Sequence, residues 1–256
     1  MSAATYIYCV IRSARKPSAA KAPAGLPGAA APQVLDAGGG TWLVCASVPL
    51  ERYGAQAIEG SLSNLEWVSA IALAHESVVE HFARRRGATV VPMKLFTMFA
   101  TPARASAEMR RRRRDLSSLF EKLQGCEEWG VRIHRGARRT VANKTAAPQS
   151  GTAFLAARKE ARDASLDAAR DSAAAADDAY AALSEVASDH RRREIEASGV
   201  TPPLLDAAFL VPVRRRARFQ ALAARTARDV TERGGTMTLT GPWPAYNFVA
   251  APEKPA

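Results

Sequence analysis

Hydrophobic and polar positions in the first half of the chain repeat with two periods, one typical of strands and one typical of helices. Alternation with period two, together with short apolar runs, predicts strands over residues 5–11, 33–36, 41–48 and 88–93. From Leu65 to Phe82 apolar side chains recur at three- and four-residue spacing, which predicts an amphipathic helix with His75 on its buried stripe. Ser63 and Glu66 form a capping-box pattern at its start. A second helix is predicted over residues 102–125.

The second half of the chain shows the order strand, helix, strand, strand, helix, strand. The expected strands cover residues 128–134, 191–197, 204–213 and 236–240, and the expected helices cover residues 150–185 and 214–233. This order is that of a ferredoxin-like sandwich. We therefore predict an α+β protein of two domains, a modified ferredoxin-like domain over residues 1–125 and a ferredoxin-like domain over residues 126–256.

The helix expected over residues 150–185 is dominated by alanine and is unusually long. At 1.5 Å per residue it would span roughly 50 Å, more than a small sheet can cover. Its best apolar stripe contains Leu155, Arg162, Leu166, Ala169, Ala173, Ala176, Tyr180 and Leu183. We expect the first half of the helix to cover its own sheet and the excess length to dock a partner helix. The predicted anchors are Leu155, Leu166, Tyr180 and Leu183.

The formal net charge of +11 suggests an acidic partner, nucleic acid or an anionic membrane. The alternative is that the high content of arginine and alanine reflects GC-rich coding. Much of the excess is one run, formed by Arg110, Arg111, Arg112, Arg113 and Arg114. Five consecutive residues of one helix span about 400°, so the run would not fit on a single solvent face. Two interpretations stay open, a solvated helix whose arginine stems lie along the rim of the core, and a basic patch for an acidic partner protein.

Candidate chemistry is sparse along the chain. His75 and His81 are six residues apart, whereas zinc ligands on one helix need a spacing of three or four. Neither a nucleophile elbow nor a phosphate-cradling glycine loop occurs, and no apolar run is long enough for a membrane span. Cys9, Cys45 and Cys126 do not form a disulfide framework, which fits a reducing cytoplasm. We predict a protein that is not an enzyme and has no catalytic residue, cofactor, metal or small-molecule substrate. His75 is interpreted as a hydrogen-bonded core residue.

The end of the chain combines an alternating strand with a stiff aromatic segment. Residues 236–240 alternate threonine with apolar residues, and Pro242 and Pro244 then restrict the backbone around Trp243. An extended aromatic segment of this kind either seals the edge of a core or presents a contact surface. We include Trp243 and Tyr246 among the predicted partner-binding residues.

This closing segment resembles the C-terminal signature of the gas vesicle GvpL/GvpF family. Further matching pieces follow the order of that family, at residues 6–10, 65–67, 74–79, 90–94, 97–99, 128–132 and 150–155. One departure is Phe96, which stands where the family pattern usually has a glycine. If that glycine has a positive φ, phenylalanine would be strained there and the loop would be built differently.

The resemblance implies a non-enzymatic role in the assembly of gas vesicles, the air-filled protein shells that give cells buoyancy. It implies a cytoplasmic, vesicle-associated accessory or minor structural protein that contacts the hydrophobic shell protein and other vesicle proteins. Neither nucleic acid nor membrane is an expected partner. The alternative is a basic nucleic-acid-binding protein on ferredoxin-like folds, although no strand carries the aromatic pattern of RNA-binding modules.

Overall fold

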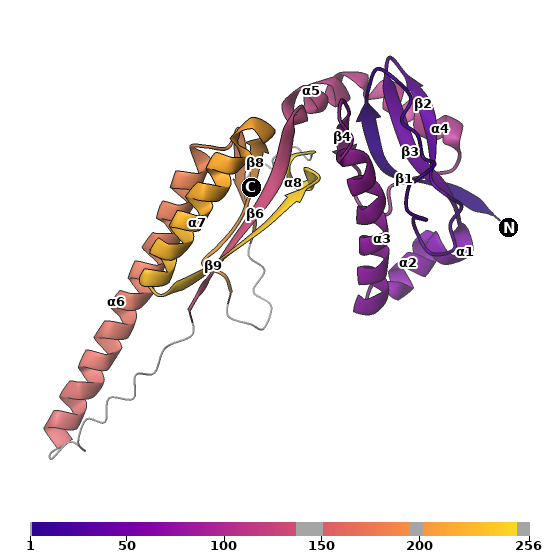
Figure 1. Cartoon of the computed structure of the whole chain (residues 1–256). Helices are drawn as coiled ribbons and strands as arrows, with labels where there is room; N and C mark the ends of the chain where they lie inside the picture. Colours follow the sequence, from indigo (N-terminus) through magenta and orange to yellow (C-terminus); the bar gives the residue numbers. More distant parts are fainter. Residues whose placement is uncertain (1, 137–150, 195–201, 250–256) are drawn as a thin grey trace. The chain divides into compact units, whose positions relative to one another are not determined.

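The computed structural model describes residues 2–136, 151–194 and 202–249, and the chain forms two compact units (Figure 1). The first unit contains Met1–Glu127 together with Trp243–Ala256, and the second contains Glu128–Pro242. The sequence predicts a domain boundary near residue 126 and assigns the closing residues to the second domain. The structure differs at this end, because residues 243–249 belong to the first unit.

A five-stranded sheet forms the centre of the first unit. Its strands are β1 (Ala3–Arg12), β2 (Gln33–Gly38), β3 (Thr41–Pro49), β4 (Thr89–Pro92) and β5 (Met98–Phe99). The order is β2-β3-β1-β4, and β5 pairs with β1. The register between β1 and β3 shifts between Ile7 and Cys9, so Tyr8 is an extra residue in the strand. Tyr6, Tyr8, Cys9 and Ile11 consequently all join one core cluster.

Helices cover the central strand β1 of this sheet, since eight of its residues in a row are buried. Two short helices, α1 (Leu50–Tyr53) and α2 (Ala55–Ser61), follow β3 and lead to α3 (Leu65–Ala83). The buried residues of α3 are Ile71, His75, Val78, Val79 and Phe82. Leu65 was expected on this stripe but is 78% exposed.

The start of α3 also differs from the sequence prediction. Asn64 is the N-cap residue, and its side chain accepts a hydrogen bond from the backbone N–H of Trp67 at 3.0 Å. The capping box expected at Ser63 is therefore wrong by one residue. Asparagine is as good an N-cap residue as serine, so the local preference alone did not decide between them.

The second predicted helix of the first unit is two helices, α4 (Pro102–Arg111) and α5 (Arg113–Leu123). Arg112 separates them, with φ of −87° and ψ of 17°. Their buried side chains include Met109, Leu116, Phe120 and Leu123. The prediction that the arginine run winds through one continuous helix is wrong, because the axis breaks inside the run.

The second unit has the predicted ferredoxin-like order of elements. These are β6 (Cys126–Arg135), α6 (Gly151–Ser184), β7 (Asp189–Arg192), β8 (Leu205–Pro212), the 3-10 turn η1 (Val213–Arg215), α7 (Arg216–Glu232) and β9 (Gly235–Trp243). The sheet order is β7-β8-β6-β9, which places the first and third strands of the motif at the centre. In β9, Met237 and Leu239 pack on the core, as the alternation predicts. Residues 195–197 of the strand expected at 191–197 lie outside the described residues.

Only the second part of α6 packs on its own sheet. Its buried residues begin at Ser172 and continue with Ala175, Ala176, Ala179 and Leu183. Figure 1 shows the N-terminal part of α6 extending beyond the sheet of its unit. Among the described residues, none of the helices combines the length and the apolar character required to cross a bilayer.

Candidate functional site

The five arginines at the junction of α4 and α5 are all exposed. Arg111 donates hydrogen bonds from Nε and Nη2 to the two carboxylate oxygens of Glu108, at 2.9 and 2.7 Å. These bonds lower the pKa of Glu108 below its ordinary value. Arg110 and Arg113 instead line a pocket on the first unit. The helix break thus separates the run into residues with different surroundings.

The predicted anchors on α6 also separate into exposed and buried residues. Leu155 is 64% exposed and Leu166 is 47% exposed, whereas Leu183 is completely buried in the core of the second unit. The hydroxyl of Tyr180 is hydrogen-bonded to Nδ1 of His190 at 2.8 Å, and the Arg192 guanidinium lies 4.4 Å from the centre of its ring. Tyr180 and Leu183 therefore hold α6 to its own sheet.

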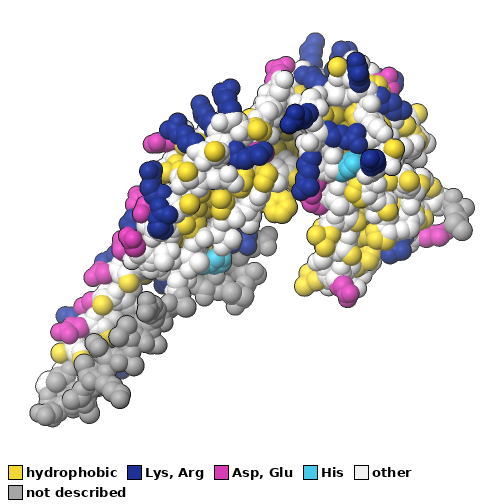
Figure 2. All heavy atoms as spheres, viewed as in Figure 1, with side chains coloured by type: hydrophobic (Ala, Val, Ile, Leu, Met, Phe, Trp, Pro, Cys, Tyr) yellow, Lys and Arg dark blue, Asp and Glu magenta, His cyan; other side chains and the backbone are white. Residues whose placement is uncertain are grey.

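The part of α6 that precedes its first buried residue, residues 152–171, is called the α6 arm below. The prediction that this first half covers the sheet is wrong, because the covering part is the second half. Besides Leu155 and Leu166, the arm exposes Phe154, which is not among the predicted anchors. Figure 2 shows hydrophobic atoms interspersed with charged side chains along this part of the helix.

Trp243 and Tyr246, the predicted aromatic contacts at the end of the chain, have different environments. Trp243 is 44% exposed. Tyr246 begins a helical turn, α8 (Tyr246–Val249), where the sequence predicted an extended segment. It packs on the core of the first unit, and Phe248 beside it is completely buried. Tyr246 and Phe248 thus seal the edge of a core, and Trp243 is the aromatic residue left accessible.

A buried polar cluster lies where α3 and α8 meet β1. The hydroxyl of Tyr6 and Nδ1 of His75 are joined by a hydrogen bond of 2.7 Å, and the ring centroids of His75 and Tyr246 are 6.1 Å apart. Burial lowers the pKa of His75 to about 4, against a small opposing effect of the Met93 backbone. Burial also raises the pKa of the adjacent Glu76, which Tyr246 approaches closely.

His75 is therefore neutral at pH 7 and enclosed in the core. The prediction of a hydrogen-bonded core histidine is confirmed, and the Tyr6 hydroxyl is a partner that the sequence did not indicate. Nε2 of His75, Oε1 of Glu76 and the hydroxyl of Tyr246 make no hydrogen bond of normal geometry with the described residues. The sequence pattern of α3 predicted the position of His75, but it contained no signal for Tyr6 or Tyr246.

Metal ligation and thiol chemistry find little support in the described part of the chain. It contains no group of three His, Cys, Asp or Glu residues that could hold a metal ion. Cys9 and Cys45 are free and buried, and burial raises the pKa of Cys45 to about 11. Such thiols stay protonated at neutral pH and are poor nucleophiles.

Comparisons with known proteins agree over nearly the whole chain. A family model described as gas vesicle synthesis protein GvpL/GvpF matches residues 4–250. Gas vesicle protein L of Streptomyces sp. (strain CB03234) is 28% identical over 224 residues, which cover 82% of this chain and 80% of that protein.

Two crystal structures share the fold. The gas vesicle protein GvpF from Anabaena sp. PCC7120 matches with a TM-score of 0.67 at 17% identity, over 100% of this chain and 99% of that chain. GvpF from Microcystis aeruginosa matches with a TM-score of 0.58 at 13% identity, over 97% and 99%. Because the family model covers far more than half of the sequence, the chain belongs to the GvpL/GvpF family of gas vesicle synthesis proteins.

Proposed function

We propose that the protein acts in gas vesicle assembly by contacting the hydrophobic shell protein, and that the α6 arm is the main contact surface. The observation that carries this proposal is the exposure of Phe154, Leu155 and Leu166 on a helix that extends past its own core. Because these side chains remain exposed in the folded chain, they add little to its stability. Exposed apolar residues on such an element are typical of a protein contact.

The geometry of the arm suits a helix-in-groove or helix-pair contact. Leu155 and Leu166 are eleven residues apart, which is close to three helical turns, so they lie on nearly the same face. Their separation along the axis is roughly 17 Å. Arg158 and Arg162 lie between them and keep the arm hydrated when no partner is bound. A shell subunit with an apolar face can bury both leucines without any chemical step.

The proposal is tested by the double variant Leu155→Gln with Leu166→Gln. Losing the burial of two leucines is expected to weaken binding to the purified shell protein by at least about tenfold, at roughly 1.5–3 kcal/mol for each fully buried leucine. The free energy of unfolding should change by less than about 0.5 kcal/mol, because both side chains are exposed. Binding is measured by co-purification and titration, and vesicle yield is followed in cells.

The matched control exchanges two exposed leucines of the first unit, Leu62→Gln with Leu73→Gln, which are 52% and 71% exposed. This control should bind the shell protein as the unchanged chain does. Equal losses in both double variants would show that the α6 arm is not the specific contact. Undiminished binding by the arm variant would refute the proposal outright.

A further inference from the structure

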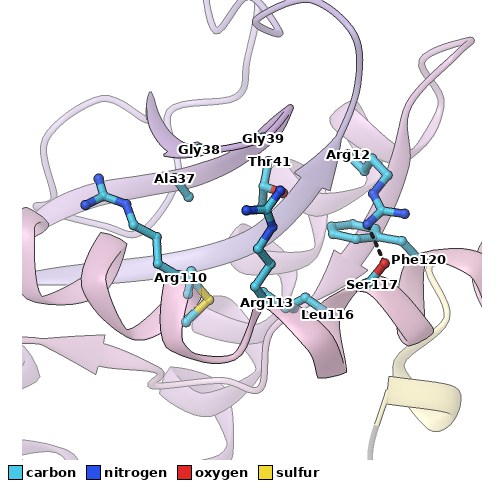
Figure 3. Close-up of a pocket in the computed structure, with 11 residues that line it drawn as sticks. Arg12, Ala37, Gly38, Gly39, Thr41, Arg110, Arg113, Leu116, Ser117 and Phe120 are labelled. Atoms are coloured by element: carbon cyan, nitrogen blue, oxygen red, sulfur yellow. Dashed lines mark hydrogen bonds between the residues drawn. The ribbon is translucent and has the colours of Figure 1, made fainter.

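A basic pocket of about 300 Å³ lies on the first unit between the β2–β3 hairpin and the helices α4 and α5 (Figure 3). Met109, Leu116 and Phe120 form its apolar floor and are nearly completely buried. Arg110 and Arg113 extend from the two helices toward the hairpin, and Arg12 extends from the end of β1 toward α5. Three guanidinium groups from separate elements thus surround one depression.

The hairpin turn allows this approach because it lacks side chains. Gly39 has φ of 63°, and a Cβ atom added to it would lie 2.8 Å from Nη2 of Arg113. A residue with a side chain would therefore be strained at this position and would also displace the guanidinium. Glycine at position 39 therefore allows both the left-handed turn and the close approach of Arg113.

The charge of the pocket is largely uncompensated. None of the eleven described residues that line it is acidic. Arg12 donates a hydrogen bond to Oγ of Ser117 at 2.9 Å, and Ser117 in turn donates to Glu121 at 3.2 Å. Within the described part of the chain, neither Arg110 nor Arg113 forms an ion pair or a side-chain hydrogen bond. Their donors are available to an anion, and a guanidinium binds carboxylates and phosphates in a bidentate manner.

The aromatic residue of the pocket limits the kind of anion. Phe120 is 1% exposed, and the Arg12 guanidinium lies 4.7 Å from the centre of its ring. Its face is therefore occupied and cannot stack on a nucleobase, which is the usual anchor of single-stranded nucleic acid. The pocket offers positive charge above a small apolar floor, which fits an acidic side chain with its methylene groups.

We infer that this pocket binds the carboxylates of an acidic peptide segment of a partner protein, with Arg110 and Arg113 as the main ligands and Arg12 as the third. Arg111, Arg112 and Arg114 do not line the pocket. The inference is independent of the α6 arm, which belongs to the other unit. Either contact can fail without affecting the other.

The test measures binding of a short polyglutamate peptide to the full chain at low and moderate salt. The double variant Arg110→Gln with Arg113→Gln should bind it at least about tenfold more weakly, because two charge-assisted contacts are lost. The matched control is Arg86→Gln with Arg114→Gln, which removes the same charge from two exposed positions outside the pocket. That control should change the affinity less than about threefold, the effect of net charge alone.

Two other results would contradict the inference that the pocket binds an acidic peptide. Equal weakening in both double variants would mean that the peptide responds to net charge and not to the pocket. Inorganic phosphate and a short oligothymidylate are titrated in parallel. If either binds in a manner that depends on Arg110 and Arg113 while polyglutamate does not, the occupant is not an acidic peptide. The single variants Arg113→Gln and Arg114→Gln repeat the comparison if a double variant fails to fold.

Discussion

Phe96 has an unusual backbone conformation in the first unit. Among the described non-glycine residues it alone has a positive φ, of 62°. Glycine adopts this left-handed conformation without strain, whereas phenylalanine does not. The Phe96 ring stacks on Trp67 with centroids 5.8 Å apart and planes at 8°. A stacked pair contributes about 0.5–1.5 kcal/mol, which compensates part of a backbone strain of about 1–3 kcal/mol.

These opposing effects predict an unusual order of stability in two variants at position 96. Both Phe96→Ala and Phe96→Gly lose the stacking, but only glycine relieves the strain. Phe96→Gly should therefore be the more stable of the two by about 1 kcal/mol in urea unfolding. The same pair of substitutions at Leu95, whose φ is not positive, should show the reverse order. Greater stability of Phe96→Ala would mean that the left-handed conformation is not retained in solution.

His75 predicts a pH dependence of folding. Its pKa falls from 6.5 to about 4 on burial, so below pH 6.5 the unfolded chain binds a proton that the folded chain does not. The stability that His75 contributes is complete above pH 6.5 and is lost as the pH falls toward 4, by up to about 3 kcal/mol. The raised pKa of Glu76 acts in the opposite direction, since its folded form binds a proton more readily than the unfolded form.

A comparison with His75→Gln isolates this effect, because Glu76 is present in both proteins. Glutamine can accept a hydrogen bond from Tyr6 and does not titrate. Free energies of unfolding are measured at pH 7 and pH 5. The unchanged chain should lose about 1–2 kcal/mol more than the variant over that interval. Parallel pH profiles would show that His75 is not buried in its neutral form.

At the scale of elements, the sequence predicted most helices and strands. It did not predict where each one ends or which of its residues are buried. Hydrophobic spacing located α3, yet it placed Leu65 on the buried stripe. The fully buried residues begin at Ile71, with Trp67 only partly buried against the core, and spacing alone cannot reveal where a neighbouring element begins. In the same way, nothing in the composition of residues 102–125 predicts the break at Arg112, since arginine is a good helix former.

The alanine-rich helix α6 illustrates the same limit. Its length and its mismatch with a small sheet were predictable, but which half would pack was not. Alanine recurs along the whole helix and buries little area anywhere, so the pattern does not distinguish the two halves. Contacts of Ser172 and Arg233 distinguish the half of α6 that packs from the half that does not. Oγ of Ser172 lies 2.8 Å from the Arg233 carbonyl, and the Arg233 side chain pairs with Asp171 and Asp178. These contacts mark where α6 joins α7.

At the scale of the whole molecule, the end of the chain returns to the first unit after the second unit is complete. Spacing along the sequence cannot predict this return, because the partners of α8 on α3 precede it by about 170 residues. The buried polar cluster depends on the same return, since Tyr246 approaches both His75 and Glu76. The first unit thus includes a segment that follows the whole second unit in the sequence, and its stability should depend on that segment.

The last prediction concerns Phe248, the completely buried residue of this returning segment. Phe248→Ala should cost about 3–5 kcal/mol, because it leaves a cavity in the core of the first unit. Amide hydrogen exchange should accelerate in β1 and α3 of the first unit while β8 and α7 of the second keep their protection. Trp243→Ala, at the more exposed aromatic residue, is the matched control and should leave both regions protected. Equal loss of protection in the two units, or none in β1, would show that α8 does not complete the first unit.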